Sequence, residues 1–157
     1  MSGDSSQCNL FSDDLTREEL EVLSRVVMMR QLAQDEVLIQ EGSIDHSLHC
    51  VLSGALCVEK STGAGETICL HVLRKGDLAG EMGFVDGAPH SATLRALAPT
   101  HVMTLERERL ESLLESHPAL VYHVMRTIIR TAHKILKRMN FHYMELSNYI
   151  TKQHGRY

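Results

Sequence analysis

The chain has 157 residues, which is enough for one domain with a sizeable core and too few for two. Its formal net charge of −4 argues against a nucleic-acid or anionic-membrane partner, because phosphate contacts need concentrated Lys and Arg. No apolar run approaches the roughly 20 residues of a membrane-spanning helix. No secretory signal is visible and none of the four cysteines forms a Cys-x-x-Cys pair, so we expect reduced thiols and a cytoplasmic location.

The N-terminal part predicts a polar tail followed by one helix. Residues 1–9 are rich in polar side chains, and we expect them to be disordered. Thr16 is an N-cap candidate, with Glu19 three residues later as its capping-box partner. The apolar stripe of this helix consists of Leu20, Leu23, Val26 and Val27.

Short segments rich in Val, Ile, Leu and Thr alternate with glycine turns from residue 37 onward, a pattern typical of a β-sandwich or barrel. The predicted strands are 37–39, 49–52, 55–59, 67–73, 92–97 and 101–105. Residues 61–65 are predicted to form a hairpin tip, which would make Cys57 and Cys69 cross-strand neighbours. We expect both cysteines to be reduced and to pack as small hydrophobic side chains.

The segment 76–95 breaks the strand pattern with four glycines and one proline, which indicates a loop with special backbone geometry. Gly80 precedes a predicted short helical turn, Gly80-Glu81-Met82-Gly83, where a ligand could approach outward-facing backbone N–H groups. Glu81 is a good acceptor for a sugar hydroxyl, and His90 and Ser91 offer polar groups for a phosphate. Together these residues predict a pocket for a ribose and phosphate unit.

A short helix is predicted from Arg107 to about His117, and a long one from about 119 to 152. Two apolar stripes run along the long helix, so we expect one to contact the β-rich part and the other the same helix of a second subunit. The stripe assigned to the dimer seam includes Met125, Ile128, Ala132, Ile135, Met139 and Leu146. The second stripe consists of Tyr122, Ile129, Leu136, Tyr143 and Ile150. The alternative is a single helix that folds back on its own domain.

The order of these motifs is more specific than any motif alone. A Ser53-Gly54 turn precedes Gly76-Asp77, Gly80–Met82, the segment Pro89-x-Ser91-Ala92-Thr93 and the long helix. Over roughly residues 10–140 this arrangement resembles the cyclic-nucleotide-binding domain family, which includes catabolite-activator-type regulators. The resemblance implies a mainly β fold with flanking helices: an eight-stranded, jelly-roll-like β-roll, an N-terminal helix and a long C-terminal helix. Residues 10–118 would form the helix and roll, and 119–157 the long helix of the same domain.

The resemblance also implies roles for individual residues. The backbone after Gly80 would contact the cyclic phosphate, Glu81 the ribose 2′-hydroxyl and Ser91 a phosphate oxygen. The remaining residues of the implied site are Met82, Gly83, His90 and Ala92, with Ile135, Leu136 and Met139 of the long helix near the base. The family places an arginine at the position of His90, and the loss of its charge-assisted bond, about 1.5–3 kcal/mol, would weaken binding by one to two orders of magnitude.

No nucleophile, acid–base pair or metal-ligand cluster stands out, so the sequence predicts a protein that is not an enzyme and holds no metal or cofactor. Few residues follow Ile150, too few for a helix-turn-helix, so we expect the signal to pass to a protein partner. We therefore predict a homodimeric regulatory module that senses a ligand similar to cyclic AMP or cyclic GMP. Two alternatives stay open: a degenerate member acting as a protein-interaction scaffold, and a sensor of another small anion.

Overall fold

The computed structural model describes the backbone of residues 10–154; the side chains of 139, 141–143 and 152–154 lie outside the description. Residues 1–9, which we expected to be disordered, also lie outside it. The helices are α1 (Arg17–Ser24), α2 (Glu81–Asp86), α3 (Arg107–Glu111) and α4 (Pro118–His154). The strands are β1 (Met28–Leu32), β2 (Val37–Ile39), β3 (Ser47–Ser53), β4 (Leu56–Ser61), β5 (Thr67–Leu73), β6 (Leu78–Ala79), β7 (Thr93–Ala96) and β8 (Thr100–Glu106).

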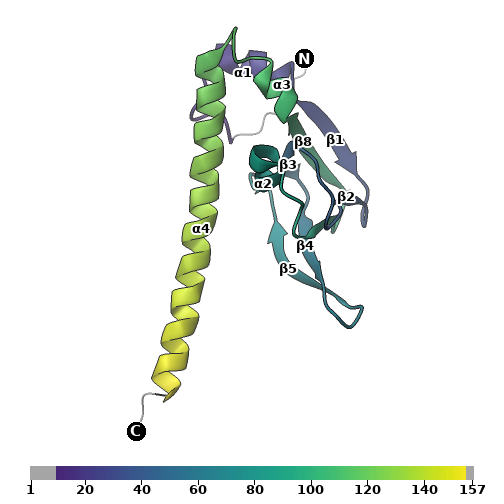
Figure 1. Cartoon of the computed structure of the whole chain (residues 1–157), viewed down its shortest axis with the longest axis vertical. Coiled ribbons are helices and arrows are strands. Elements are labelled where there is room, and N and C mark those ends of the chain that lie inside the picture. The colour runs from purple at the N-terminus through teal and green to yellow at the C-terminus, as the bar shows by residue number, and fades with distance from the viewer. Residues whose placement is uncertain (1–9, 155–157) are drawn as a thin grey trace.

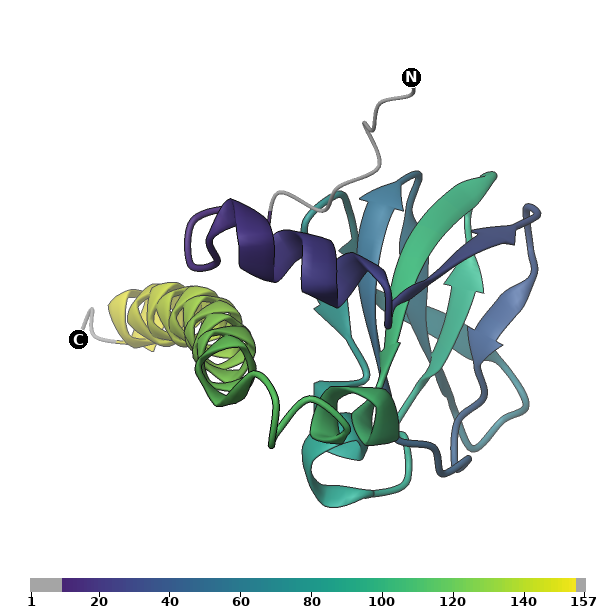
Figure 2. The same ribbon diagram turned by 90° about the horizontal axis from the view of Figure 1, so that it is seen from above.

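The strands form two antiparallel sheets of four strands each, in the orders β1-β8-β3-β6 and β2-β7-β4-β5. The two sheets form the roll, and the helices lie to one side of it (Figures 1 and 2). This arrangement confirms the predicted eight-stranded β-roll with flanking helices.

The described residues form two hydrophobic clusters because one sheet is covered on both faces. Inside the roll, residues of both sheets meet, among them Val51, Leu56, Leu94, Ala96 and Val102. On the other side of the β1-β8-β3-β6 sheet, a second cluster joins the helices, with Phe11, Leu48, Leu105, Leu120 and Val124 among its members. β3 belongs to both clusters, so four consecutive residues of this strand are buried and it lacks the usual polar alternation.

All six predicted strands are present, within two residues at each end, but two strands were missed. β1 exposes four of its five residues, so no apolar alternation marks it. β6 has only two residues. Strands of these kinds are recognised through their pairing partners, β8 and β3, rather than through their own pattern.

The predicted capping box of α1 is confirmed: the Glu19 N–H donates to Thr16 Oγ1 at 3.1 Å, and the Thr16 N–H donates to Glu19 Oε1 at 2.9 Å. The helix ends at Ser24, however, so Val26 and Val27 are not part of its stripe. Both valines instead pack, partly buried, against the helix-side cluster from the connection to β1.

The prediction that Cys57 and Cys69 are reduced is wrong, because the structure joins them in a disulfide across β4 and β5. The register of the hairpin, which pairs Ser61 with Thr67, places Glu59, rather than Cys57, opposite Cys69. The two sulfur atoms therefore meet diagonally across the strand pair. Cys57 and Cys69 therefore no longer support the cytoplasmic location that we expected from reduced thiols.

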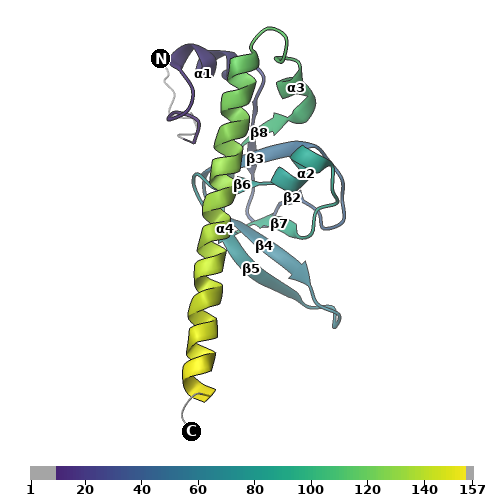
Figure 3. The same ribbon diagram turned by 60° about the vertical axis from the view of Figure 1, so that its left-hand side comes forward.

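α4 has 37 residues and runs beside the roll before continuing past the β4–β5 hairpin (Figures 1 and 3). Its first half is tied to the N-terminal segment through Asp14 and Glu19. His123 Nδ1 lies 2.9 Å from Glu19 Oε2, and Arg130 Nη1 lies 2.8 Å from Asp14 Oδ1. Within residues 10–154, no helix is both long and apolar enough to cross a membrane.

Candidate functional site

The turn before α2 has the backbone geometry that the glycine-rich loop predicted. Gly80 has a φ of 81° and is the N-cap of α2. A Cβ at this position would lie 2.8 Å from the carbonyl oxygen of Ser47, so both the backbone angle and the close approach of β3 require glycine. Because Gly80 has no side chain to cap the helix, the first N–H groups of α2 are left for an external acceptor.

The His90 imidazole packs beneath α2. Its Nε2 lies 3.2 Å from Asp45 Oδ1, and its side chain is only 8% exposed. A Cβ at Gly83 would lie 2.9 Å from His90 Cε1, so the second glycine of the loop makes room for this ring. A phosphate contact by the imidazole would therefore require the pair with Asp45 to open.

Asp45 is charged and His49 is neutral near pH 7, because their surroundings differ. Burial raises the pKa of Asp45, but the Ser47 N–H and the His90 side chain outweigh burial and lower that pKa overall. Burial lowers the pKa of His49 to about 4, against the opposing effect of Asp45. His49 is therefore neutral near pH 7, with its Nδ1 2.8 Å from the Thr104 hydroxyl, while Asp45 is ionised.

Ser91 is exposed where the loop approaches β7, and a lysine reaches it from β4. Lys60 Nζ donates to the Ser91 carbonyl oxygen at 2.7 Å and lies 3.7 Å from Glu41 Oε2. The Glu41 N–H in turn donates to Thr93 Oγ1 at 2.9 Å. A positive charge therefore lies directly beside the serine predicted to contact phosphate.

The sequence analysis missed Lys60, although β4 carries a signal for it. Residues i, i+2 and i+4 of a strand share one face. Leu56 and Val58 pack inside the roll, so Lys60 follows them on the inner face near the end of β4. Asp45 was missed because nothing in its neighbourhood in the sequence indicates a partner 45 residues away.

The other predicted loop residues lie on one continuous segment. Glu81 and Met82 open α2, half-buried and exposed respectively. The approach of Gly83 to His90 brings the start of α2 close to the end of the loop, where Ser91 and half-buried Ala92 follow. Among the described side chains, no group of three or more His, Cys, Asp or Glu could hold a metal ion.

The two stripes of α4 face different surroundings, and one residue was assigned to the wrong side. Ile128 is 2% exposed because it packs in the helix-side cluster, so it has no surface for a second subunit; this corrects its assignment to the dimer seam. Ile135, seven residues on, is half-buried. The stripe that the chain leaves exposed contains Tyr122, Ile129 and Leu136. The side chain of Met139 lies outside the described part.

The family described as "Cyclic nucleotide-binding domain" matches residues 29–117, which include the whole loop and all strands but the start of β1. The chain belongs to this family.

Relatives of this cyclic nucleotide-binding domain include enzymes and receptors. Patatin-like phospholipase domain-containing protein 6 of Mus musculus is 25% identical over 125 residues, which cover 79% of this chain and 9% of that protein. The Cyclic AMP receptor protein of Thermus thermophilus is 25% identical over 116 residues, which cover 74% of this chain and 54% of that protein. The chain thus spans 9% and 54% of the lengths of these curated relatives.

A solved structure shows the same fold. A cyclic nucleotide-binding domain from Methylobacillus flagellatus superposes with a TM-score of 0.78 at 24% sequence identity, covering 83% of this chain and 76% of that one.

Proposed function

We propose that this domain binds a cyclic nucleotide between the α2 turn and α4, and that α4 reports the binding to a partner protein. The observation that carries the proposal is the left-handed Gly80 N-cap, which leaves the first N–H groups of α2 open to an anion. Membership of the cyclic nucleotide-binding domain family supports it, and so does the likeness to a protein named as a cyclic AMP receptor.

Each chemical part of the ligand has a matching group. The N–H groups at the start of α2 and the exposed Ser91 take the phosphate, while the Glu81 carboxylate accepts from a ribose hydroxyl. The base packs against the exposed apolar side chains of β5, Ile68 and Leu70, and against α4 near Ile135 and Leu136. Met139 lies one helical turn beyond Ile135 in the sequence and belongs to the same proposed contact.

A ligand of this kind acts on α4 because it contacts the roll and the helix together. It stabilises the arrangement in which those surfaces meet, and any partner that distinguishes this arrangement receives the signal. The domain itself needs no catalytic group for this role. Nucleotide ligands are made in the cytoplasm, so we place the domain there in this proposal.

The exposed stripe of α4 supports a homodimer. Tyr122, Ile129 and Leu136 are exposed, and positions 143 and 150 continue their spacing of seven residues. Met125, Ala132, Met139 and Leu146 fall between these positions, so the alternating steps of three and four form a heptad seam. The seam expected from the sequence also contained these four residues. In the proposed seam, Ile128 and Ile135 are replaced by the residues of the exposed stripe.

Titration calorimetry with cyclic AMP and cyclic GMP tests the proposal. The wild type should bind at least one of them, and Glu81→Gln should weaken binding about tenfold, because a neutral amide accepts more weakly than a carboxylate. Asp86→Asn, an exposed change at the far end of α2, is the matched control and should leave the affinity unchanged. Absence of binding by the wild type would exclude the proposal.

The His90–Asp45 pair favours a second candidate function. The His90 imidazole is buried, and its Nε2 lies 3.2 Å from Asp45 Oδ1. The loop therefore has no side chain that projects freely at the position where the family has its arginine. A domain with such a loop could serve as an interaction scaffold or take another small anion. A dimer that binds neither nucleotide would favour the scaffold, and binding of inorganic phosphate alone would favour the other anion.

A further inference from the structure

The position between Pro89 and Ser91 does not present a positive charge to a ligand in this structure. His90 occupies it, with its side chain 8% exposed and its Nε2 paired with Asp45. Gly83 packs against the same ring and limits the freedom of the imidazole to turn outward. A phosphate bound at the start of α2 would therefore need a cation from another element.

Lys60 is placed to be that cation. It extends from the inner face of β4, with its side chain 48% exposed, and its Nζ donates to the Ser91 carbonyl oxygen at 2.7 Å. An ammonium carries three N–H groups on a flexible stem, so it can keep this bond and direct another donor to an anion.

The present counter-ion of Lys60 is weakly held. Glu41 Oε2 lies 3.7 Å from Nζ, and both side chains are partly exposed. Ion pairs of this kind contribute little to stability, so a ligand phosphate can replace the carboxylate at small cost. Glu41 also accepts from the Ser61 N–H at 3.4 Å, which gives it another partner when Lys60 turns away.

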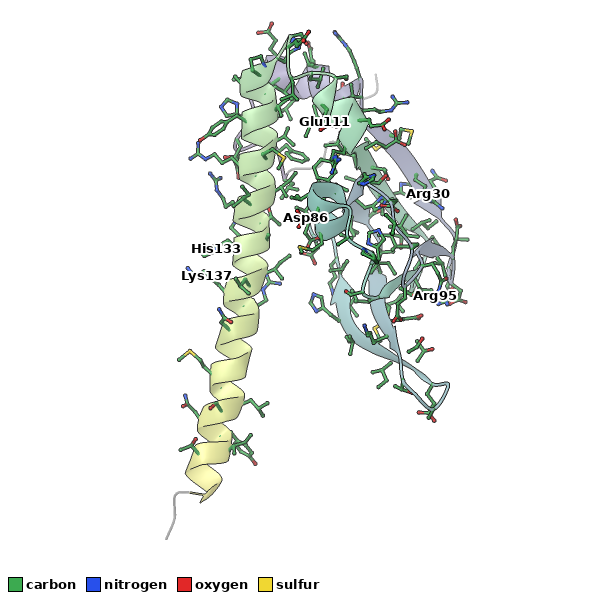
Figure 4. All side chains as sticks on the ribbon, in the orientation of Figure 1. Arg30, Asp86, Arg95, Glu111, His133 and Lys137 are labelled. Carbon is green, nitrogen blue, oxygen red and sulfur yellow. A yellow bond between two sulfur atoms is a disulfide. The ribbon has the colours of Figure 1, made fainter. Side chains whose placement is uncertain are left out.

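The other basic residue of β4 and β7 is already engaged elsewhere. Arg95 Nε lies 3.1 Å from Glu59 Oε2, and Arg95 Nη1 donates to the Asp35 carbonyl oxygen at 2.9 Å. Figure 4 shows Arg95 on the side of the roll remote from α4.

We propose that Lys60 supplies the positive charge for the phosphate of the bound ligand, in place of an arginine in the loop. This inference rests on the proposed function, because it assigns a role within the same site. According to this inference, a residue of β4 contributes to the specificity for an anionic ligand together with the residues of the loop.

The test is calorimetry on the full chain with cyclic AMP. Lys60→Gln should weaken binding about tenfold, the size of one partly exposed charge-assisted contact, and Lys60→Arg should restore most of it. Lys75→Gln, at an exposed lysine in the turn between β5 and β6, is the matched control and should bind as the wild type does. Raising the salt concentration should weaken the wild type more than Lys60→Gln, because salt screens a charge contact and leaves packing unaffected.

Three results separate this inference from its alternatives. Lysine is charged throughout pH 6 to 8, so wild-type affinity should change little over that range; a rise at pH 6 that His90→Gln abolishes would assign the charge to His90 and overturn the inference. Wild-type binding with an unchanged Lys60→Gln affinity would overturn it while leaving the proposed function intact. No binding by the wild type would overturn both.

A second variant guards against a folding defect in Lys60→Gln. Glu41→Gln removes the competing carboxylate and keeps Lys60, so it should bind cyclic AMP at least as tightly as the wild type. An affinity below that of the wild type would count against the inference.

Discussion

The Thr127 hydroxyl donates to Asp14 Oδ2 at 2.7 Å, which joins the middle of α4 to the segment before α1 across 113 residues of sequence. Arg130 adds an ion pair to the same carboxylate at 2.8 Å. The Thr127 hydroxyl and the Arg130 guanidinium hold the pKa of Asp14 below its usual value despite the opposing effect of burial. The first half of α4 is therefore held to the domain, while the second half extends past the roll (Figure 3).

Thr127→Val should lower the free energy of unfolding by about 1–2 kcal/mol, because it keeps the shape of a buried side chain and removes the donor to Asp14. Thr151→Val is the matched control in the same helix. Its hydroxyl donates to the carbonyl oxygen four residues earlier at 2.9 Å, and Thr127 Oγ1 lies at a similar 3.0 Å from the corresponding carbonyl oxygen, but Thr151 is exposed. Urea unfolding measures both, and equal losses would contradict the role of Asp14.

Stability should fall as the pH drops from about 6.5 toward 4 because of His49. The unfolded imidazole takes up a proton near pH 6.5, whereas the folded one resists protonation down to about 4. The unfolded state therefore binds more protons in this window and is favoured by up to about 3 kcal/mol. The lowered pKa of Asp45 places its own loss of stability below 3.8, outside the window.

His49→Gln, whose amide cannot be protonated in this range, should flatten the pH dependence measured by urea unfolding at a series of pH values. His101→Gln, at an exposed histidine on β8, should leave the slope unchanged. A slope in His49→Gln as steep as that of the wild type would show that other groups cause the acid sensitivity.

Gly80→Ala should cost more stability than Gly42→Ala, although both glycines have positive φ, 81° and 86°. At Gly42 an added Cβ meets nothing within 4 Å, so the cost is the backbone strain alone, about 1 kcal/mol. At Gly80 the same atom would lie 2.8 Å from the Ser47 carbonyl oxygen, which adds about 1–3 kcal/mol of overpacking. Unfolding by urea compares the two, and calorimetry should show loss of nucleotide binding in Gly80→Ala only.

Ile129→Asp and Ile128→Asp separate the dimer seam from the core at adjacent positions. Ile129 is 64% exposed and Ile128 is 2% exposed. Ile129→Asp should give a folded monomer in sedimentation, because it places a charge in the seam without touching the core. Ile128→Asp should destabilise the fold by about 4 kcal/mol or more, because it buries a carboxylate among apolar side chains. A monomeric wild type would refute the seam.

Features that depend on neighbours in the sequence were predictable. The capping box joins residues three apart, and the glycine before α2 is required by its own backbone angle and a tight turn. The strands with apolar alternation were found, whereas β1 was not, because an edge strand with four exposed residues carries no such pattern. The diagonal meeting of Cys57 and Cys69 depends on the register of the hairpin, which spacing alone does not reveal.

The sequence alone determined a β-rich sandwich or barrel, the loop and the existence of two stripes on α4, because periodicity and turn chemistry act over a few residues. The eight-stranded roll was implied by the family resemblance of the motif order. Only the tertiary structure decided which stripe is buried, since Ile128 and Ile129 are equally apolar and differ only in what packs against them. The tertiary structure also decided which charged and polar groups of the site lie next to each other. The pairs His90–Asp45 and Lys60–Ser91 join residues 45 and 31 positions apart, and contacts at that separation form only when the strands that carry them are brought together.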